Sequence, residues 1–80
     1  MPSNNYCAYV AINTEPKSTK EVFRKLQETR GVKTANTISG PYDILVRLEA
    51  DTHRDAFNTV LSEIRCFPGV QHTETWTCWE

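Results

Sequence analysis

The stretch Ser39-Gly40-Pro41-Tyr42-Asp43 lies at the middle of this chain of 80 residues, between two runs of strand-forming residues. Gly40 tolerates backbone angles that other residues avoid, and Pro41 fixes its own φ, so the stretch predicts the bend of a β-hairpin. A bend by itself requires neither the aromatic ring of Tyr42 nor the carboxylate of Asp43.

The two sides of this turn repeat one pattern. Five residues of the first half recur 38 positions later, where Val22, Phe23, Leu26, Gly31 and Val32 match Val60, Leu61, Ile64, Gly69 and Val70. Each half contains a strand, a helix and a second strand, and right-handed crossovers place both helices on one face of the sheet. The sequence therefore predicts an α+β, ferredoxin-like β-α-β-β-α-β fold, with a four-stranded antiparallel sheet and two helices on one face.

Composition and periodicity give the bounds of these elements. Helical spacing predicts a helix from Ser18 to about Arg30, with Ser18 and Glu21 as a capping box. A second helix, capped by Asp51 or Thr52, ends at residues 67–69. Aromatic and β-branched residues predict four strands, at Tyr6–Ile12, Val32–Ile38, Ile44–Ala50 and Val70–Trp79.

The first predicted strand is apolar on both faces. One face carries Tyr6, Ala8, Val10 and Ile12, and the other carries Cys7, Tyr9 and Ala11. A strand that is apolar on both sides is covered on both sides. The helices of this chain cover one face only, so the sequence predicts a homodimer that forms through the sheet.

Charge and hydropathy exclude several classes of function. The chain carries nine Lys and Arg against ten Asp and Glu, a formal net charge of -1, and its basic residues are scattered. Binding through phosphate groups needs a basic face, so direct nucleic-acid binding is not expected. No apolar run has the length of a membrane span, and residues 1–5 lack the pattern of a signal peptide. We therefore expect a cytoplasmic protein with no membrane contact.

Cysteine usage predicts thiols. The chain has an odd number of cysteines, Cys7, Cys66 and Cys78, without the spacing of a zinc site. The sequence therefore predicts three reduced, partly buried thiols, with neither a disulfide framework nor a metal site.

No catalytic arrangement is evident in the sequence. His53 and His72 have no nucleophile at a suitable spacing, so both are expected to be structural or surface residues. Glu49, Asp51 and Asp55 lie near a helix start, where capping and the helix dipole account for them. We predict no catalytic residue and no cofactor.

Two tryptophans near the end of the chain form a separate feature. Trp76 and Trp79 on an exposed terminal strand would promote aggregation unless something covers them. We expect an oligomer contact there. The alternative is a small-molecule pocket walled by these rings.

These motifs together resemble the effector-binding domain of Lrp/AsnC transcriptional regulators, also called the RAM domain. The resemblance runs from about Tyr6 to Trp79, and the order and spacing of its segments make it specific. Those segments are Ala8-Tyr9-Val10-Ala11-Ile12-Asn13-Thr14-Glu15-Pro16, Gly31-Val32, the centre from Ser39 to Val46, and Ile64-Arg65-Cys66-Phe67-Pro68-Gly69-Val70 with Thr73 and Thr75.

The resemblance implies an assembly and a ligand. Such domains dimerise through the sheet, assemble further, commonly as a ring of four dimers, and bind free amino acids at the contact between dimers. The positions that match the family's binding site are Gly40, Tyr42, Asp43, Thr73 and Thr75. Turn amides would donate hydrogen bonds to the carboxylate of the amino acid, and Asp43 would accept them from its ammonium group.

Full regulators of this kind carry an N-terminal helix-turn-helix, which this sequence lacks. The chain resembles the stand-alone form, one domain over residues 1–80 that senses amino acids or co-assembles with full-length Lrp/AsnC-type regulators. We expect an amino-acid-binding and oligomerisation module in transcriptional regulation, and not an enzyme. Two alternatives are a dimeric α/β-barrel enzyme, with His72, Glu74 and Trp76 as its candidate residues, and a purely structural assembly domain.

Overall fold

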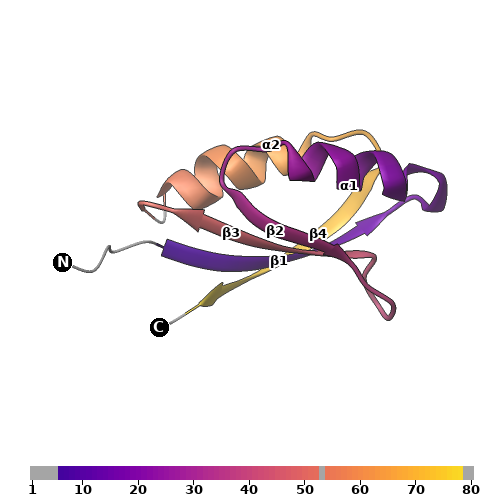
Figure 1. Cartoon of the computed structure of the whole chain (residues 1–80), viewed down its shortest axis with the longest axis horizontal. Coiled ribbons are helices and arrows are strands. Elements are labelled where there is room, and N and C mark those ends of the chain that lie inside the picture. The colour runs from indigo at the N-terminus through magenta and orange to yellow at the C-terminus, as the bar shows by residue number, and fades with distance from the viewer. Residues whose placement is uncertain (1–5, 53, 79–80) are drawn as a thin grey trace.

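The computed structural model describes residues 6–52 and 54–78, so the predicted positions His53 and Trp79 lie outside the described residues. The chain forms two layers, a four-stranded sheet and a layer of helices on one of its faces (Figure 1). In chain order the elements are β1 (Tyr6–Thr14), the 3₁₀ turn η1 (Pro16–Ser18), α1 (Thr19–Gln27), β2 (Val32–Thr37), β3 (Ile44–Ala50), the π-helix η2 (Asp55–Leu61), α2 (Ser62–Arg65) and β4 (Val70–Cys78). The predicted ferredoxin-like fold is confirmed.

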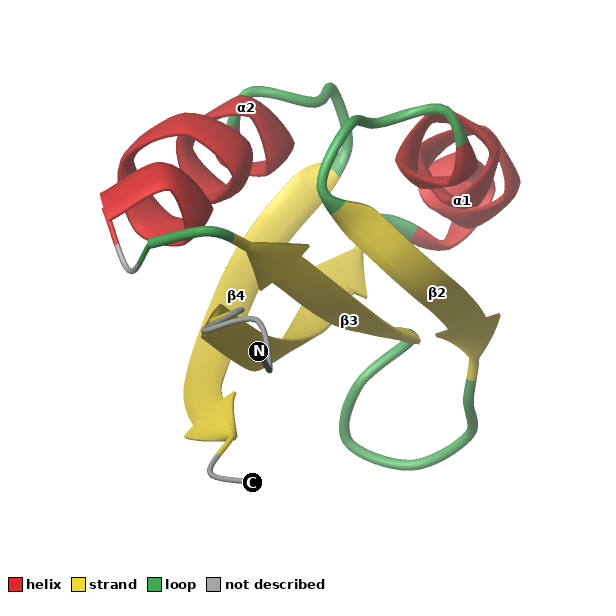
Figure 2. Ribbon diagram, turned by 60° about the vertical axis from the view of Figure 1, so that its left-hand side comes forward, coloured by secondary structure: helices red, strands yellow, loops and turns green. Residues whose placement is uncertain are grey.

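The sheet has the strand order β2-β3-β1-β4, and every neighbouring pair is antiparallel. Figure 2 shows both helices on the same side of the sheet, with the β2–β3 connection extending beyond it. We call the end where Ile12 pairs with Ile44 and Thr73 the turn end. We call the end where Cys7 pairs with Glu49 and Cys78 the terminal end.

The hydrophobic core lies between the sheet and the helices. Alternate residues of a strand share one face, and helix residues four apart share one side, which selects the buried set. Its members are Ala8, Val10, Ile12, Val22, Leu26, Ile44, Val46, Leu48, Val60, Leu61 and Ile64. Val22 and Leu26 of α1, with Val60, Leu61 and Ile64 of η2 and α2, supply the helix side of the core.

Among the described residues, no helix covers the opposite face of the sheet, and we call it the open face. Tyr9 and Trp76 are cross-strand neighbours on it, with 37% and 48% of their surface exposed. The guanidinium of Arg47 lies 5.4 Å from the Tyr9 ring centroid and donates hydrogen bonds to the Tyr9 hydroxyl (2.9 Å) and the Glu49 carboxylate (3.0 Å). The open face thus combines exposed aromatic surface with a half-buried ion pair.

The start of α1 differs from the predicted capping box. Ser18 occupies the N-cap position without a side-chain capping bond, and its hydroxyl lies 3.5 Å from the Glu15 carboxylate instead. Pro16 begins a 3₁₀ turn ahead of the helix, which leaves Ser18 at φ −102°, ψ −8° and not in the extended conformation of a capping residue. Glu21 pairs with Arg24 (2.6 Å), and this hydrogen bond lowers the pKa of the Glu21 carboxyl.

Three predicted bounds are also wrong. β1 continues two residues beyond Ile12 because Thr14 pairs with Val70. α1 ends at Gln27, since the chain turns before Gly31, which has a φ of +95°. β2 ends at Thr37 and not at Ile38.

A β-bulge shifts the faces of β2. The sequence alternation places Val32 on the same face as Thr34 and opposite Ala35. The pairing register shifts between Val32 and Thr34, so that Val32 pairs with Leu48 and Ala35 with Val46, both core residues. One extra residue in a strand moves the residues before it to the opposite face. Val32 therefore lies on the same face as Ala35 and not on that of Thr34.

The second helix begins as a π-helix and not as the expected α-helix. The Thr52 hydroxyl accepts the Asp55 N–H (3.0 Å), so Thr52 caps it, as one of the two predicted choices. A π-helix bonds residue i to i+5, and Ala56 and Leu61, five apart, are both buried. Val60 and Leu61 also reach the core from this wider helix.

The prediction of three reduced, partly buried thiols is wrong, because two of the cysteines form a disulfide and the third is exposed. Cys7 and Cys78 are opposite each other on β1 and β4, with 5.1 Å between their Cα atoms, and form a disulfide. Their separation of 71 residues in sequence hides this contact, which only the pairing of the first and last strands creates. Cys66 is a free, exposed thiol.

Candidate functional site

The predicted turn lies at the turn end of the sheet and exposes its backbone. Gly40 has a φ of +134°, and a Cβ atom added to it would meet nothing within 4 Å. Asp43 closes the hairpin, because its N–H donates to the Ile12 carbonyl and its own carbonyl accepts the Ile38 N–H, both at 2.9 Å. A ligand can therefore approach the main chain at Gly40 without displacing a side chain.

The carboxylate of Asp43 ties this turn to the end of β1. Its Oδ2 accepts the Thr14 N–H (2.9 Å) and lies 3.5 Å from the Thr14 hydroxyl. The Thr14 and Thr19 hydroxyls are in turn 2.6 Å apart. This series of hydrogen bonds, from Asp43 through Thr14 to Thr19, links the turn to the first residue of α1. It uses one of the two carboxylate oxygens of Asp43 and leaves the other available.

Tyr42 crosses the open face to β4. Its ring stacks on His72 (6.4 Å between centroids) and meets Trp76 edge-on (6.5 Å). Its hydroxyl donates a hydrogen bond to the Glu74 carboxylate, and this bond, with some burial, raises the pKa of Tyr42 above its ordinary value. Tyr42 thus fastens the turn to the edge strand, and all three residues considered for catalysis, His72, Glu74 and Trp76, contact it.

Thr73 and Thr75 lie on the other face of β4. They pair with Ile12 and Val10, two core residues, so they face the helices and not the ring of Tyr42. The Oγ1 atom of Thr75 is buried and has no hydrogen-bond partner among the described residues. Four of the five predicted binding residues, all but Thr75, therefore lie at the turn end. Tyr42 reaches the open face, whereas Thr73 and Thr75 face the helices.

The sequence reasoning missed Arg65, the last residue of α2. Its Nε donates to the Thr73 hydroxyl (3.3 Å), and the two residues line a surface hollow of about 380 Å³ together with Val70, Gln71 and His72. No carboxylate within 6–52 and 54–78 forms an ion pair with Arg65. The signal that the sequence offers for this residue is the internal repeat, which places Arg65 at the end of a helix, directly before the turn that leads into β4.

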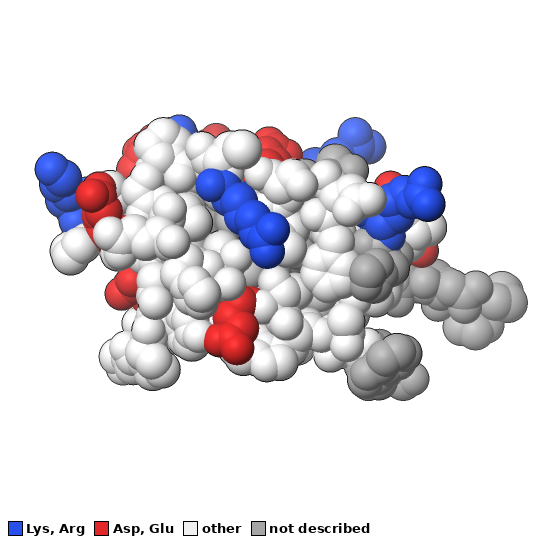
Figure 3. Space-filling model, turned by 180° about the vertical axis from the view of Figure 1, so that it is seen from behind, with Lys and Arg blue, Asp and Glu red and all other residues white. Residues whose placement is uncertain are grey.

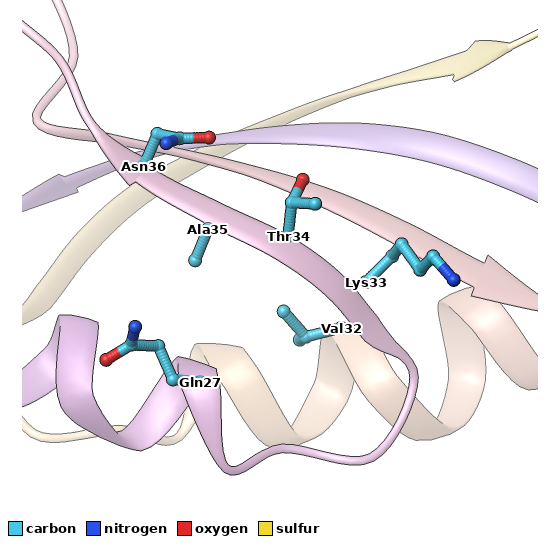
Figure 4. Close-up of a pocket in the computed structure, with 6 residues that line it drawn as sticks. All are labelled: Gln27, Val32, Lys33, Thr34, Ala35 and Asn36. Atoms are coloured by element: carbon cyan, nitrogen blue, oxygen red, sulfur yellow. The ribbon is translucent and has the colours of Figure 1, made fainter.

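Two other hollows lie elsewhere. One of about 400 Å³ runs along the exposed edge of β2, where Val32 and Ala35 point toward the helix layer and Gln27 (Figure 4). Another, of about 480 Å³ at the terminal end, is lined by Arg30 and by the acids Glu49, Asp51, Asp55 and Glu63. Neither contains a residue of the predicted turn.

The charges on the surface are mixed. Figure 3 shows one side of the molecule, on which Lys, Arg, Asp and Glu are scattered among neutral residues without a basic patch. In the described part of the chain, no helix is long and apolar enough to cross a membrane. The same residues contain no cluster of three or more His, Cys, Asp or Glu able to hold a metal ion.

The fold and the arrangement at the turn end define a ferredoxin-like domain with one uncovered sheet face. The sequence model of the Lrp/AsnC ligand binding domain matches residues 7–80. The chain therefore belongs to the Lrp/AsnC ligand binding domain family, and the resemblance found in the sequence is confirmed. It is a ligand-binding module of a family of regulators.

Solved structures agree with this assignment. FFRP-DM1 is 31% identical, with a TM-score of 0.86 over 92% of this chain and 99% of that one. A protein of Pyrococcus horikoshii, PHS023, is 31% identical with a TM-score of 0.85, over 94% and 90% of the two chains. AsnC of E. coli shares the fold, with a TM-score of 0.83 at 19% identity, over 98% of this chain and 52% of that one.

Curated relatives include homocitrate synthases. The protein of Sulfurisphaera tokodaii is 37% identical over 75 residues, which are 92% of this chain and 16% of the enzyme. That of Sulfolobus acidocaldarius is 33% identical over the same shares. The chain thus spans about a sixth of the length of these relatives.

Proposed function

We propose that this domain binds a free amino acid at the turn end of its sheet, self-associates through its open face, and couples the two events in transcriptional regulation. The open backbone at Gly40 carries the proposal, since it lies beside Asp43 and on the same end of the sheet as Arg65. A free amino acid has one carboxylate and one ammonium group, and this end offers a guanidinium and a carboxylate to match them.

In this proposal each group has a defined partner. The ligand carboxylate accepts hydrogen bonds from Arg65 and from turn amides near Gly40. The ligand ammonium donates to the oxygen of Asp43 that Thr14 does not use. Thr73, whose hydroxyl already accepts from Arg65, orients the guanidinium, and Tyr42 holds the turn in place through β4.

Self-association follows from the exposed aromatic rings of the open face. Tyr9 and Trp76 form an adjacent apolar pair, and a second copy would remove both from water. A homodimer through this face, extended to a ring of dimers, leaves the turn ends free to meet other dimers. In this proposal the domain takes part in regulation by co-assembly with full-length regulators.

The test is a thermal-unfolding screen of the purified protein against the common amino acids. A ligand at a hundred times its dissociation constant adds about 2.7 kcal/mol of stability, which shifts the midpoint by several degrees in a domain this small. Asp43→Asn and Arg65→Gln should abolish the shift. Arg30→Gln, which removes an exposed arginine from the terminal end, should retain it.

Three results would contradict separate parts of the proposal. No shift with any amino acid would remove the ligand. A stable monomer at micromolar concentration in sedimentation equilibrium would remove the association. Failure to co-purify with any full-length relative would remove the regulatory partner.

A second candidate function rests on the homocitrate synthases that match 92% of this chain. We infer from them that the same module can control an enzyme by binding an amino acid, without taking part in the chemistry. His72 and Glu74 both contact Tyr42, so they serve the turn and not a reaction. Adding the purified domain to the homocitrate synthase of its own organism, with each amino acid in turn, would show a changed rate.

A further inference from the structure

We propose that Cys7 and Cys78 are a reversible redox pair that fastens the last strand of the sheet to the first. Their Cα atoms are 5.1 Å apart, within the range of disulfides, and strand pairing places them directly opposite each other. The inference does not depend on ligand binding or on the proposed function.

The disulfide lies where it can hold the end of an edge strand in the sheet. β4 is an edge strand, held on one side by β1 alone, and Cys78 is its last residue. Upstream on the same strand face are Trp76, Glu74 and His72, the residues that hold Tyr42. The disulfide therefore fixes the free end of the strand on which the turn depends.

The two sulfur atoms differ in access. Cys7 has 5% of its surface exposed and lies between Glu49 of β3 and Cys78 of β4, while Cys78 is half-buried at the strand end. In the free chain, before a second copy covers the open face, small-molecule disulfides can reach Cys78, so Cys78 is the sulfur that exchanges with them. Cys66 is exposed in the helix layer at the end of α2, on the far side of the sheet, and takes no part.

The oxidation uses a low-molecular-weight disulfide such as oxidised glutathione. The Cys78 thiolate attacks one sulfur of the oxidant, forms a mixed disulfide and releases one small thiol. The Cys7 thiolate then attacks Cys78 Sγ and releases the second small thiol. The two protein thiols lose two protons and two electrons, and the electrons reduce the oxidant to two thiols. Such pairs are transient where the thiol pool is reducing and persist where it is oxidising.

The test equilibrates the folded protein across a series of reduced-to-oxidised glutathione ratios, stops exchange with acid, and counts free thiols after unfolding by alkylation and mass spectrometry. We expect one reactive thiol at the oxidising end and three at the reducing end, with both forms present between them. Cys66→Ser should lower both counts by one. Cys78→Ser, at the half-buried position, should remove the dependence on the ratio, and Cys7→Ala checks this with the buried partner.

Stability gives a second readout. The disulfide closes a long loop, so reduction should lower the thermal midpoint of the wild type by about 10 °C or more, and leave that of Cys78→Ser unchanged. Three reactive thiols at every ratio would overturn the proposal, because the bond would not form. One reactive thiol even in a large excess of reduced glutathione would overturn its reversibility. A covalent dimer through Cys7 or Cys78 would also contradict it.

Discussion

The two faces of the sheet draw on the same strand, β1, yet they differ in what covers them. Ala8, Val10 and Ile12 are fully buried beneath the helices. On the open face Cys7 and Ala11 are also nearly buried, at 5% and 2% exposed, while Tyr9 between them is 37% exposed. Ala11 is hidden between its larger cross-strand neighbours Leu45 and Glu74, and Cys7 between Glu49 and its disulfide partner Cys78, without a second layer. An apolar alternation on both faces therefore indicates burial on both faces, but a packed core on only one.

The largest expected effect separates the two faces within one strand. Leu48 lies fully buried on the helix side of β3, and Leu45 lies half-buried on the open face. Leu48→Ala should lower the free energy of unfolding by about 2–5 kcal/mol through a lost core contact and a cavity. Leu45→Ala should cost about 1 kcal/mol, in proportion to its smaller buried area. Urea unfolding at low protein concentration measures both, and equal losses would mean that the open face is covered in solution.

The next effect extends the comparison to two glycines. Gly69 and Gly40 both have positive φ, at +96° and +134°, but only Gly69 is crowded, since an added Cβ would lie 2.3 Å from Ser18 Cβ. Both alanine variants bear backbone strain. Gly69→Ala adds overpacking and should be less stable than Gly40→Ala by about 1–3 kcal/mol in urea unfolding. Similar losses would show that the helix-side loop can shift at no cost.

A smaller effect tests the association proposed for the open face. Trp76→Glu places a charge on the exposed apolar pair, and should weaken self-association at least about tenfold, which corresponds to roughly 1.4 kcal/mol. Sedimentation equilibrium measures the change. Gln71→Glu adds the same charge to β4 near the turn end, and serves as the control. An unchanged average mass for Trp76→Glu would place the contact elsewhere.

The smallest effect concerns pH. The hydrogen bond to Glu74, together with burial, raises the pKa of Tyr42 above its ordinary value of 10.0. The folded state therefore holds this proton more tightly than the unfolded state, so the stability gained is complete below about pH 10 and is lost as the pH rises through the raised pKa. The stability difference between wild type and Tyr42→Phe should be constant near neutral pH and narrow above about pH 10. A difference that persists unchanged would contradict the role of the hydroxyl.

Local chemistry predicted the architecture well, because repeated apolar spacing and the Gly-Pro turn specify elements and their order. The prediction was wrong where the local structure depends on contacts between residues far apart in the sequence. The bulge at Lys33 depends on pairing with Leu48, and the Cys7–Cys78 bond depends on strands at opposite ends of the chain. Ser18 has the residue type of a cap, but the 3₁₀ turn before it prevents capping.

The candidate site was predictable only where a local sequence motif specifies it. Gly40 and Asp43 stand in a recognisable motif, and the structure places both at the turn end. The bond from Asp43 to Thr14 and the approach of Arg65 to Thr73 are tertiary contacts that no local pattern encodes. Thr75 faces the helices because strand alternation sets it opposite Val10.

The meeting of the first and last strands at the terminal end also affects how the domain can be joined to other proteins. With the Cα atoms of Cys7 and Cys78 only 5.1 Å apart, the domain can be inserted into a host loop or attached at either end with little strain on its linkers. The turn end lies the length of β1 away, about 25–30 Å for nine residues, so a host would leave it uncovered. The attachment point and the proposed binding site are thus separated along one strand, a geometry suited to a domain that is joined to different hosts.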